Sequence, residues 1–171
     1  MKLVTIALAG ACLAAAPAAA MDLTSPDIAN GARAPMSMVG SDCGGKNEAP
    51  ALSWSDAPKE TKSFTVMVYD LDARPTGFHH WIVVDIPPDV TSLPKGKPLP
   101  AGAVVAQNDY ARARYDGPCP PKGTPHRYHV VVWAEDEADY PYRQYMTGTY
   151  IRPWMILHGI GKGEITVTYG R

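Results

Sequence analysis

The segment DLDARPTGFHHW, residues 70–81, places two carboxylates and two imidazoles within twelve residues. Its acids are Asp70 and Asp72, and its histidines are His79 and His80. Carboxylates and imidazoles this close together could bind a metal ion, transfer protons or help to hold an anion such as phosphate. Which chemistry they perform depends on the elements that position them and on the groups that join them.

Strand-like sequences flank this segment on both sides. SFTVMVYD (63–70) is apolar on both faces and predicts a central strand, and HHWIVVDI (79–86) predicts a second one. If the two strands pair as a hairpin, Asp70 and His80 lie near the same end of the sheet. Successive side chains on a strand point to opposite faces, so only one of the two histidines can share a face with Asp70.

A third histidine opens another predicted strand. HRYHVVVWAED (126–136) begins at His126, and Tyr128, two residues later, is expected to point in the same direction. The preceding sequence YDGPCPPKGTP (115–125) predicts a stiff loop with exposed backbone because it is rich in proline and glycine.

The remaining elements indicate the fold class. PALSW (50–54) and GEITVTYG (163–170) predict further strands, and the proline-rich residues 87–102 predict a loop. RPWMILHGIG (152–161) predicts a short helix with Pro153 in its first turn. Strands and helices do not alternate, so we predict an all-β-dominated fold: an antiparallel β-sandwich with Greek-key-like connections and one or two short helices.

Length and charge limit the possible partners. The 171 residues suffice for one domain with a real core. The formal net charge of −1 provides no bulk attraction to nucleic acid or to an anionic membrane. We therefore expect no nucleic-acid partner.

Residues 1–20 have the order of a secretory signal peptide. Lys2 precedes an apolar run, and small residues at 18–20 form an A-x-A cleavage site, which predicts cleavage before Met21. The run is too short for a stable membrane span, so we expect a periplasmic or secreted protein with a single domain at residues 21–171. Lipoprotein processing at Cys12 is the alternative.

Export leaves two cysteines, Cys43 and Cys119. An oxidising compartment favours a disulfide between them, which would close a loop of about 75 residues and stabilise the fold by about 4 kcal/mol. Two separate buried thiols are the alternative, and a thiol active site is disfavoured because no CxxC motif occurs.

Four interpretations compete for the polar cluster. The acids could cap a turn while the histidines pack in a wet rim. A metal site lacks diagnostic spacing such as HExxH, and a hydrolase using Asp70 and His80 as acid and base lacks a GxSxG nucleophile. In the fourth, imidazoles, a tyrosine hydroxyl and backbone N–H groups hold an anion, with a neighbouring aspartate keeping a histidine protonated. We expect no metal and no cofactor.

Three ordered motifs also resemble a known family. SFTVMVYDLDARPTGFHHWIVVDIP, YDGPCPPKGTPHRYHVVVWA and ILHGIGKGEITVTYGR are similar to the phosphatidylethanolamine-binding proteins, which include the Raf kinase inhibitor proteins and exported bacterial relatives. The resemblance covers nearly all of the chain after residue 20. It implies a β-sandwich with a small, preformed anion pocket at one end.

The family motifs can be carried over residue by residue. The resemblance implies a ligand-binding set of Asp70, Asp72, His80, Gly117, Pro120, Pro121, His126 and Tyr128, with no catalytic residue. Exported bacterial members also look as if they carry a cysteine at the position of Cys43, which fits the bridge to Cys119.

This chain departs from the pattern at the hairpin. Leu71 replaces a proline, and Arg74 is extra, so the rim of the pocket differs in shape. Arg74 could add a donor for phosphate or stay solvated, with solvation favoured. His79 is expected to be structural and His158 to serve packing.

Three functions follow from these observations. The preferred one is non-catalytic binding of a small anion, such as a phosphate or phosphorylated head group. The alternatives are a hydrolase using Asp70 and His80, and a secreted interaction or inhibitor protein that uses loop 87–102. The sequence names neither the natural ligand nor a protein partner.

Overall fold

The computed structural model describes residues 18–171, which form nine strands and one α-helix. A short 3-10 turn lies on either side of the middle of the chain, at Ser41–Cys43 and Arg143–Tyr145. The helix is α1 (Gly148–His158). The strands are β1 (Ala19–Ala20), β2 (Asp22–Thr24), β3 (Leu52–Ser55), β4 (Ser63–Asp70), β5 (Phe78–Ile86), β6 (Ser92–Leu93), β7 (Val104–Val105), β8 (His126–Glu135) and β9 (Gly159–Tyr169).

The strands form two sheets. The larger sheet has the order β1-β9-β8-β4-β5-β7, and the smaller has the order β2-β3-β6. Strand β1 runs parallel to β9, while the other strand pairs are antiparallel. The fold is therefore mostly β with one helix, but the expectation of purely antiparallel sheets is wrong at this edge. Strand β1 comes from residues that the sequence assigned to the signal peptide; the Greek-key-like sandwich stays a prediction.

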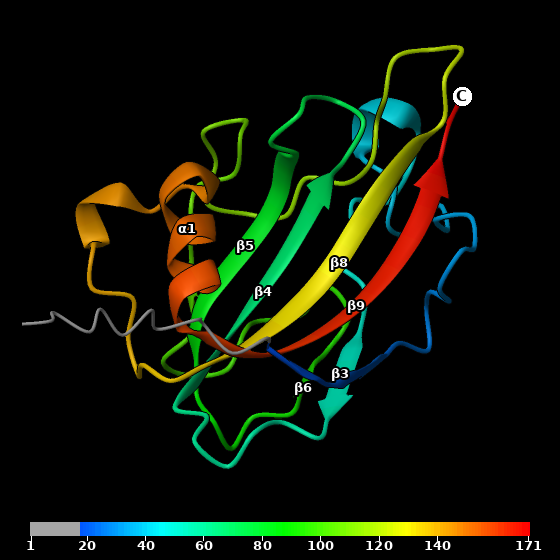
Figure 1. Ribbon diagram of the computed structural model, residues 1–171. Helices are drawn as coiled ribbons and strands as arrows, with labels where there is room; N and C mark the ends of the chain where they lie inside the picture. The colour runs from blue at the N-terminus through cyan, green and yellow to red at the C-terminus, as the bar shows by residue number, and fades with distance from the viewer. Residues whose placement is uncertain (1–17) are drawn as a thin grey trace, which may run out of the picture.

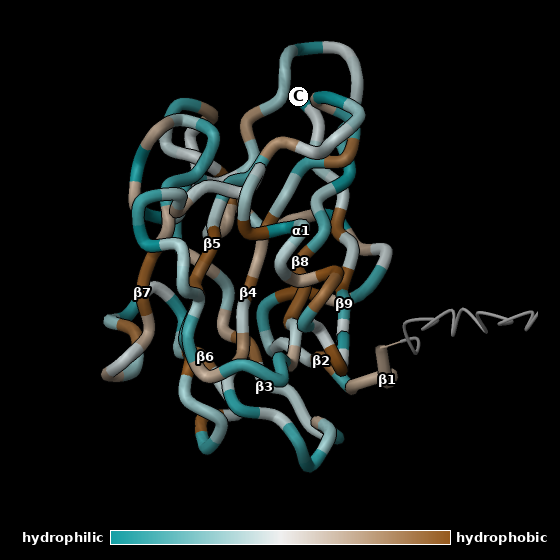
Figure 2. The backbone as a smooth tube through the Cα atoms, turned by 60° about the vertical axis from the view of Figure 1, so that its left-hand side comes forward, coloured by the Kyte–Doolittle hydropathy of each residue, from teal (hydrophilic) through white to brown (hydrophobic). Residues whose placement is uncertain are grey.

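Each face of the larger sheet has its own apolar cluster. On one face, β4 and β8 pack with the smaller sheet, and the rings of Trp54 and Phe64 lie 5.3 Å apart. On the other face, Ile151 and Met155 of α1 pack against Met67 of β4 and its neighbours. Figure 1 shows α1 lying against β4 and β5, and Figure 2 shows hydrophobic residues on the strands and hydrophilic residues in the loops.

A β-bulge sets the direction of the second histidine. Val68 is paired with Trp81 and Tyr69 with His79, so the register shifts and His80 is an extra residue on β5. In a bulge, two residues of one strand face a single residue of its partner. His80 therefore shares the face of Asp70, as alternation predicts, and Trp81 packs into the core on that same face.

Loops from distant parts of the chain meet at one end of the larger sheet. The hairpin loop between β4 and β5, the 3-10 turn at Ser41–Cys43 and the loop before β8 lie together there (Figure 1). Cys43 and Cys119 form a disulfide with a Cα–Cα distance of 5.5 Å, which confirms the predicted pairing. The bridge ties the 3-10 turn to the loop before β8.

Two further expectations concern membranes and export. No helix among residues 18–171 has the length and hydropathy needed to cross a membrane. Most of the predicted signal peptide, including Cys12, lies outside the described residues, so cleavage and lipoprotein processing stay predictions.

Candidate functional site

A cavity of about 190 Å³ opens at this end of the larger sheet. It gathers six of the eight residues that the family motifs pointed to, namely Asp70, His80, Pro120, Pro121, His126 and Tyr128, together with Ala73, Phe78, Tyr110 and Cys119. We call it the hairpin pocket because strands β4 and β5 meet there. Strand pairing explains the convergence, since Asp70 is opposite Phe78 on one side and opposite Tyr128 on the other.

The other two predicted residues support the walls and do not line the cavity. Both carboxylate oxygens of Asp72 bind the Arg127 side chain, at 2.7 and 3.0 Å, and this hydrogen bonding lowers the pKa of Asp72 to about 2. The pair ties the hairpin loop to β8. The Gly117 N–H donates to Asn47 Oδ1 at 2.7 Å, and a Cβ at Gly117 would lie 2.0 Å from the Met38 carbonyl oxygen. Only glycine lets these two loops approach so closely.

Asp70 holds the geometry of the hairpin pocket. Its side chain is buried, Oδ1 accepts the N–H groups of Asp72 and Ala73 at 2.8 and 3.1 Å, and Oδ2 lies 2.7 Å from His126 Nδ1. The partner of Asp70 is therefore His126, whereas the sequence analysis brought Asp70 together with His80. The contact fixes the imidazole of His126 through Nδ1 and leaves Nε2 for a ligand.

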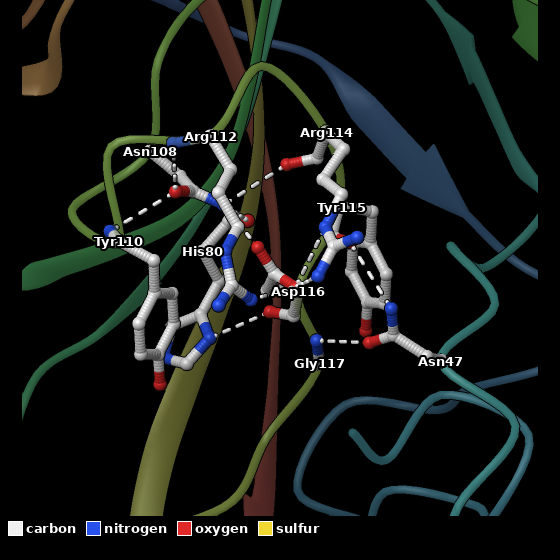
Figure 3. Close-up of polar contacts among 9 residues, drawn as sticks. All are labelled: Asn47, His80, Asn108, Tyr110, Arg112, Arg114, Tyr115, Asp116 and Gly117. Atoms are coloured by element: carbon white, nitrogen blue, oxygen red, sulfur yellow. Dashed lines mark hydrogen bonds and ion pairs between the residues drawn. The ribbon is translucent and has the colours of Figure 1, made fainter. Parts of the chain in front are cut away.

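His80 is held by a different group. Its Nδ1 lies 2.7 Å from the carbonyl oxygen of Asp116, and a carbonyl only accepts, so Nδ1 carries the proton (Figure 3). Burial lowers the pKa of His80, although this hydrogen bond and the nearby carboxylate of Asp70 oppose the shift. A neighbouring aspartate therefore does not keep His80 charged. Near neutral pH its Nε2 is a hydrogen-bond acceptor.

The loop that positions Asp116 is held by hydrogen bonds and ion pairs to the Asp116 carboxylate. Asp116 Oδ1 accepts from Arg114 Nε at 3.0 Å and from Arg112 Nη1 at 3.3 Å, while Asn108 Nδ2 donates to Oδ2 at 2.8 Å (Figure 3). Burial raises the pKa of Asp116, but the hydrogen bonds from Arg114 and Asn108 outweigh it and lower the pKa overall. The ionised carboxylate therefore fixes the carbonyl that orients His80.

Tyr128 contributes a buried hydroxyl donor next to Asp70 in the hairpin pocket. The residue is fully buried, and its hydroxyl has no hydrogen-bond partner among residues 18–171. Burial, and then the charge of Asp70, raise the pKa of Tyr128 well above its ordinary value, so the hydroxyl keeps its proton. A buried hydroxyl without a partner costs about 1–3 kcal/mol, which a ligand or water in the pocket would recover.

Sequence reasoning missed part of the lining. Phe78 could have been found, because it lies two residues before His80 on the same strand. Tyr110 carried no sequence signal, since it comes from the loop after β7, and its ring packs 5.8 Å from that of His80. Arg74 lies outside the lining and pairs with Asp109.

One group in the described chain offers three possible metal ligands within 4.8 Å of one another: Asp136, Glu137 and His158. It lies where β8 ends, whereas His126 begins that strand at the hairpin pocket. His158 also stacks on Trp154 at 3.8 Å between ring centroids, which agrees with the packing role expected for it.

The family model for "Phosphatidylethanolamine-binding protein" matches residues 24–170. The chain belongs to the phosphatidylethanolamine-binding protein family. The match takes in the whole hairpin pocket, so the pocket is part of the family domain.

Relatives of this family in Escherichia coli K12 match most of the chain. UPF0098 protein YbcL is 42% identical over 165 residues, which is 90% of each chain, and UPF0098 protein YbhB is 35% identical over 158 residues, covering 87% of this chain and 99% of YbhB. A solved structure of E. coli YbcL, described as a new member of the mammalian PEBP family, superposes with a TM-score of 0.83 at 39% identity. The superposition covers 88% of this chain and 98% of that one.

A mycobacterial family member bears on location. LppC of Mycobacterium tuberculosis H37Rv, whose name describes it as a candidate lipoprotein, is 38% identical over 120 residues, covering 69% of this chain and 57% of LppC.

Proposed function

We propose that the hairpin pocket binds a small phosphate-bearing anion, either free phosphate or the head group of a phosphorylated molecule. The observation that carries this proposal is the Tyr128 hydroxyl, which is buried beside two histidines and has no hydrogen-bond partner in the described part of the chain. A phosphate oxygen would accept a hydrogen bond from this hydroxyl. The family name suggests the same class of ligand.

The ring nitrogens suit a partly protonated phosphate. His80 Nε2 would accept a hydrogen bond from a P–OH group, whereas His126, held at Nδ1 by Asp70, would donate from Nε2 when it is protonated. A monohydrogen phosphate offers both a donor and several acceptors. A cavity of about 190 Å³ suits a small head group.

We propose that the binding is non-catalytic. Both oxygens of Asp70 are engaged with His126 and with backbone N–H groups, so Asp70 does not form an acid–base pair with His80. The sulfur of Cys119 lies in the disulfide and is not a free nucleophile. These contacts disfavour the hydrolase alternative. For location, we propose export to the periplasm or the medium, with cleavage before Met21.

Calorimetric titration with inorganic phosphate and with O-phosphoethanolamine tests the pocket. We expect saturable binding of O-phosphoethanolamine that Tyr128→Phe weakens by about tenfold, since one hydrogen bond to a charged group is lost. The matched control is Tyr140→Phe, because Tyr140 is equally buried but belongs to the apolar cluster under α1.

The outcomes separate the alternatives. Equal binding by both tyrosine variants would exclude the Tyr128 hydroxyl as a ligand group. Release of phosphate from a phosphate ester by the wild-type protein, lost in His126→Gln, would replace the binding proposal with a hydrolase.

A further inference from the structure

A second cavity, of about 200 Å³, lies on the opposite face of the same hairpin. It opens between the β4–β5 loop and the first turns of α1, and we call it the helix cavity. Strand alternation separates the two, because His79 faces α1 while His80 faces the hairpin pocket. Residues of the loop, of β5 and of the helix line it, among them Arg74, His79, Arg152, Pro153 and Ile156.

His79 is the buried polar group of the helix cavity. Its side chain is 4% exposed, and Nδ1 lies 3.0 Å from Asp109 Oδ2, which also accepts the His79 backbone N–H at 2.6 Å. Nε2 is covered and has no hydrogen-bond partner in the described part of the chain. Buried side-chain polar atoms are rarely left in this state without an unseen ligand or water.

Asp109 is a permanent anion behind the imidazole. Burial raises the pKa of Asp109, but hydrogen bonds from His79 and from Arg74 outweigh it and lower the pKa to about 2. The carboxylate therefore keeps the proton of the ring on Nδ1. When the ring is protonated, Nε2 also carries a hydrogen and can donate to an anion.

Two further positive features face the helix cavity. The Arg152 guanidinium donates to the Thr76 carbonyl oxygen at 2.5 Å and lies over the Tyr69 ring, and no carboxylate in residues 18–171 pairs with it. Helix α1 starts at Gly148 with no side-chain cap and no acidic residue in its first turn. Its first N–H groups and its dipole therefore favour a negative charge there.

The chemistry of the lining selects the kind of anion. Of the two guanidinium groups in the lining, Arg74 is paired with Asp109, and Arg152 has no carboxylate partner among residues 18–171. Pro153 and Ile156 add apolar walls. A carboxylate that accepts from His79 Nε2 requires the protonated ring, which adds a second positive charge to that of Arg152. The choice of anion therefore rests on the apolar walls, which suit an anion with a hydrocarbon part.

We propose that the helix cavity is a second ligand site, which binds a small organic carboxylate through His79 and Arg152. The carboxylate accepts from the imidazole and from the guanidinium, and its hydrocarbon part packs on Pro153 and Ile156. This site is independent of the hairpin pocket.

Benzoate and its neutral isostere benzamide are the probes, followed by NMR of the histidine imidazole nitrogens in the folded chain. We expect benzoate to shift the His79 signals in a saturable way and to leave those of His80 and His126 in place, while benzamide shifts none of them. Arg152→Gln should weaken benzoate binding by about tenfold, because one charge-assisted hydrogen bond is lost.

Arg33→Gln is the matched control. The Arg33 guanidinium also donates to a backbone carbonyl, that of Gly170, and also lies over a tyrosine ring, that of Tyr169. We expect this variant to bind benzoate like the wild type. Equal losses in the two variants, equal binding of benzamide, or no saturable shift of His79 at millimolar benzoate would overturn the proposal.

Tyr128→Phe distinguishes the two sites. Benzoate binding that survives in Tyr128→Phe supports the helix cavity whether or not phosphate binds elsewhere. Benzoate binding that is lost in Tyr128→Phe and retained in Arg152→Gln would assign the carboxylate to the hairpin pocket and overturn the second site.

Discussion

The protonation of single buried side chains depends on how this fold encloses them, and Glu135 is the clearest case. The residue is 2% exposed beneath α1, with Oε2 accepting from Trp154 Nε1 at 3.0 Å and Oε1 without a partner in the described chain. Burial raises the pKa of Glu135 from 4.5 to about 7, against the opposing effects of the Thr65 hydroxyl and of the hydrogen bond from Trp154. The folded protein therefore holds a proton that the unfolded chain releases in mildly acidic solution.

Glu135→Gln should stabilise the protein at alkaline pH. Between pH 4.5 and about 7 the folded state binds more protons than the unfolded state, so the free energy of unfolding falls as pH rises, by about 3 kcal/mol in total. Glutamine keeps an acceptor for Trp154 and has no charge to bury. We expect a gain of up to about 3 kcal/mol at pH 8 that becomes small at pH 4.5, measured by chemical denaturation at both values.

Glu137→Gln is the control for this prediction. Glu137 is exposed two residues further along the chain, so the same change of charge should alter stability by less than about 0.5 kcal/mol at either pH. A loss of stability in Glu135→Gln at pH 8 would mean that the ionised carboxylate has stabilising partners.

Among the elements, the sequence predicted those whose pattern is local. Strand β4 has the predicted bounds, and β5 and β8 differ from prediction by one residue, because each is a continuous apolar run. Helix α1 starts four residues before the predicted Arg152, and β9 starts four residues before the predicted Gly163. The two-residue strands β1, β6 and β7 were missed, and β6 lies within residues 87–102, which were predicted to be a loop. These elements depend on tertiary contacts, such as the packing of Ile151 against the sheet, which no local pattern specifies.

The residues of the candidate site were also predicted where local motifs identify them, and their pairing, which depends on tertiary contacts, was not. Asp70, His80, His126 and Tyr128 were placed in one pocket by family motifs and alternation, and the structure brings them together. The pairing of Asp70 with His126 could not be derived, because it depends on the register of β4 against β8. The bulge at His80 could not be derived either, because it depends on the register of β4 against β5.

The disulfide links two of these elements and gives an element-scale prediction. Cys43 and Cys119 are 76 residues apart, so replacing both with serine should lower the free energy of unfolding by about 4 kcal/mol. Because Cys119 lines the hairpin pocket, we also expect weaker binding of O-phosphoethanolamine. Denaturant titration and calorimetry measure the two effects. Unchanged stability in the double variant would show that the loops are held by other contacts, such as the hydrogen bond from Gly117 to Asn47.

At the scale of the whole molecule, one hairpin serves two cavities. The neighbouring histidines His79 and His80 point to opposite faces of the larger sheet, and each is held at Nδ1 by an oxygen of the loop at residues 106–116. The loop therefore orients one histidine on each face of the larger sheet. Phosphate at one cavity and a carboxylate at the other could be bound together without sharing a ligand group.

The edge of the larger sheet connects the fold with the proposed export. Cleavage before Met21 would remove β1, whose two residues are exposed and pair with Gly161 and Lys162. Met21 itself is buried, and its N–H donates to the Lys162 carbonyl oxygen at 2.9 Å. Met21 would therefore be the first residue of the cleaved chain, and it is also the first of residues 18–171 whose side chain is buried in the fold.

A chain of residues 21–171 should thus be as stable as one of residues 18–171, within about 0.5 kcal/mol, because only an exposed edge is removed. Met21→Ala in the shorter chain should lower the free energy of unfolding by about 2 kcal/mol through lost burial. Denaturant titration of the three proteins tests this, and mass spectrometry of the exported full-length chain locates its first residue. If deleting residues 18–20 costs as much as Met21→Ala, β1 is an integral strand, and a mature chain that keeps it must begin at Ala19 or before it.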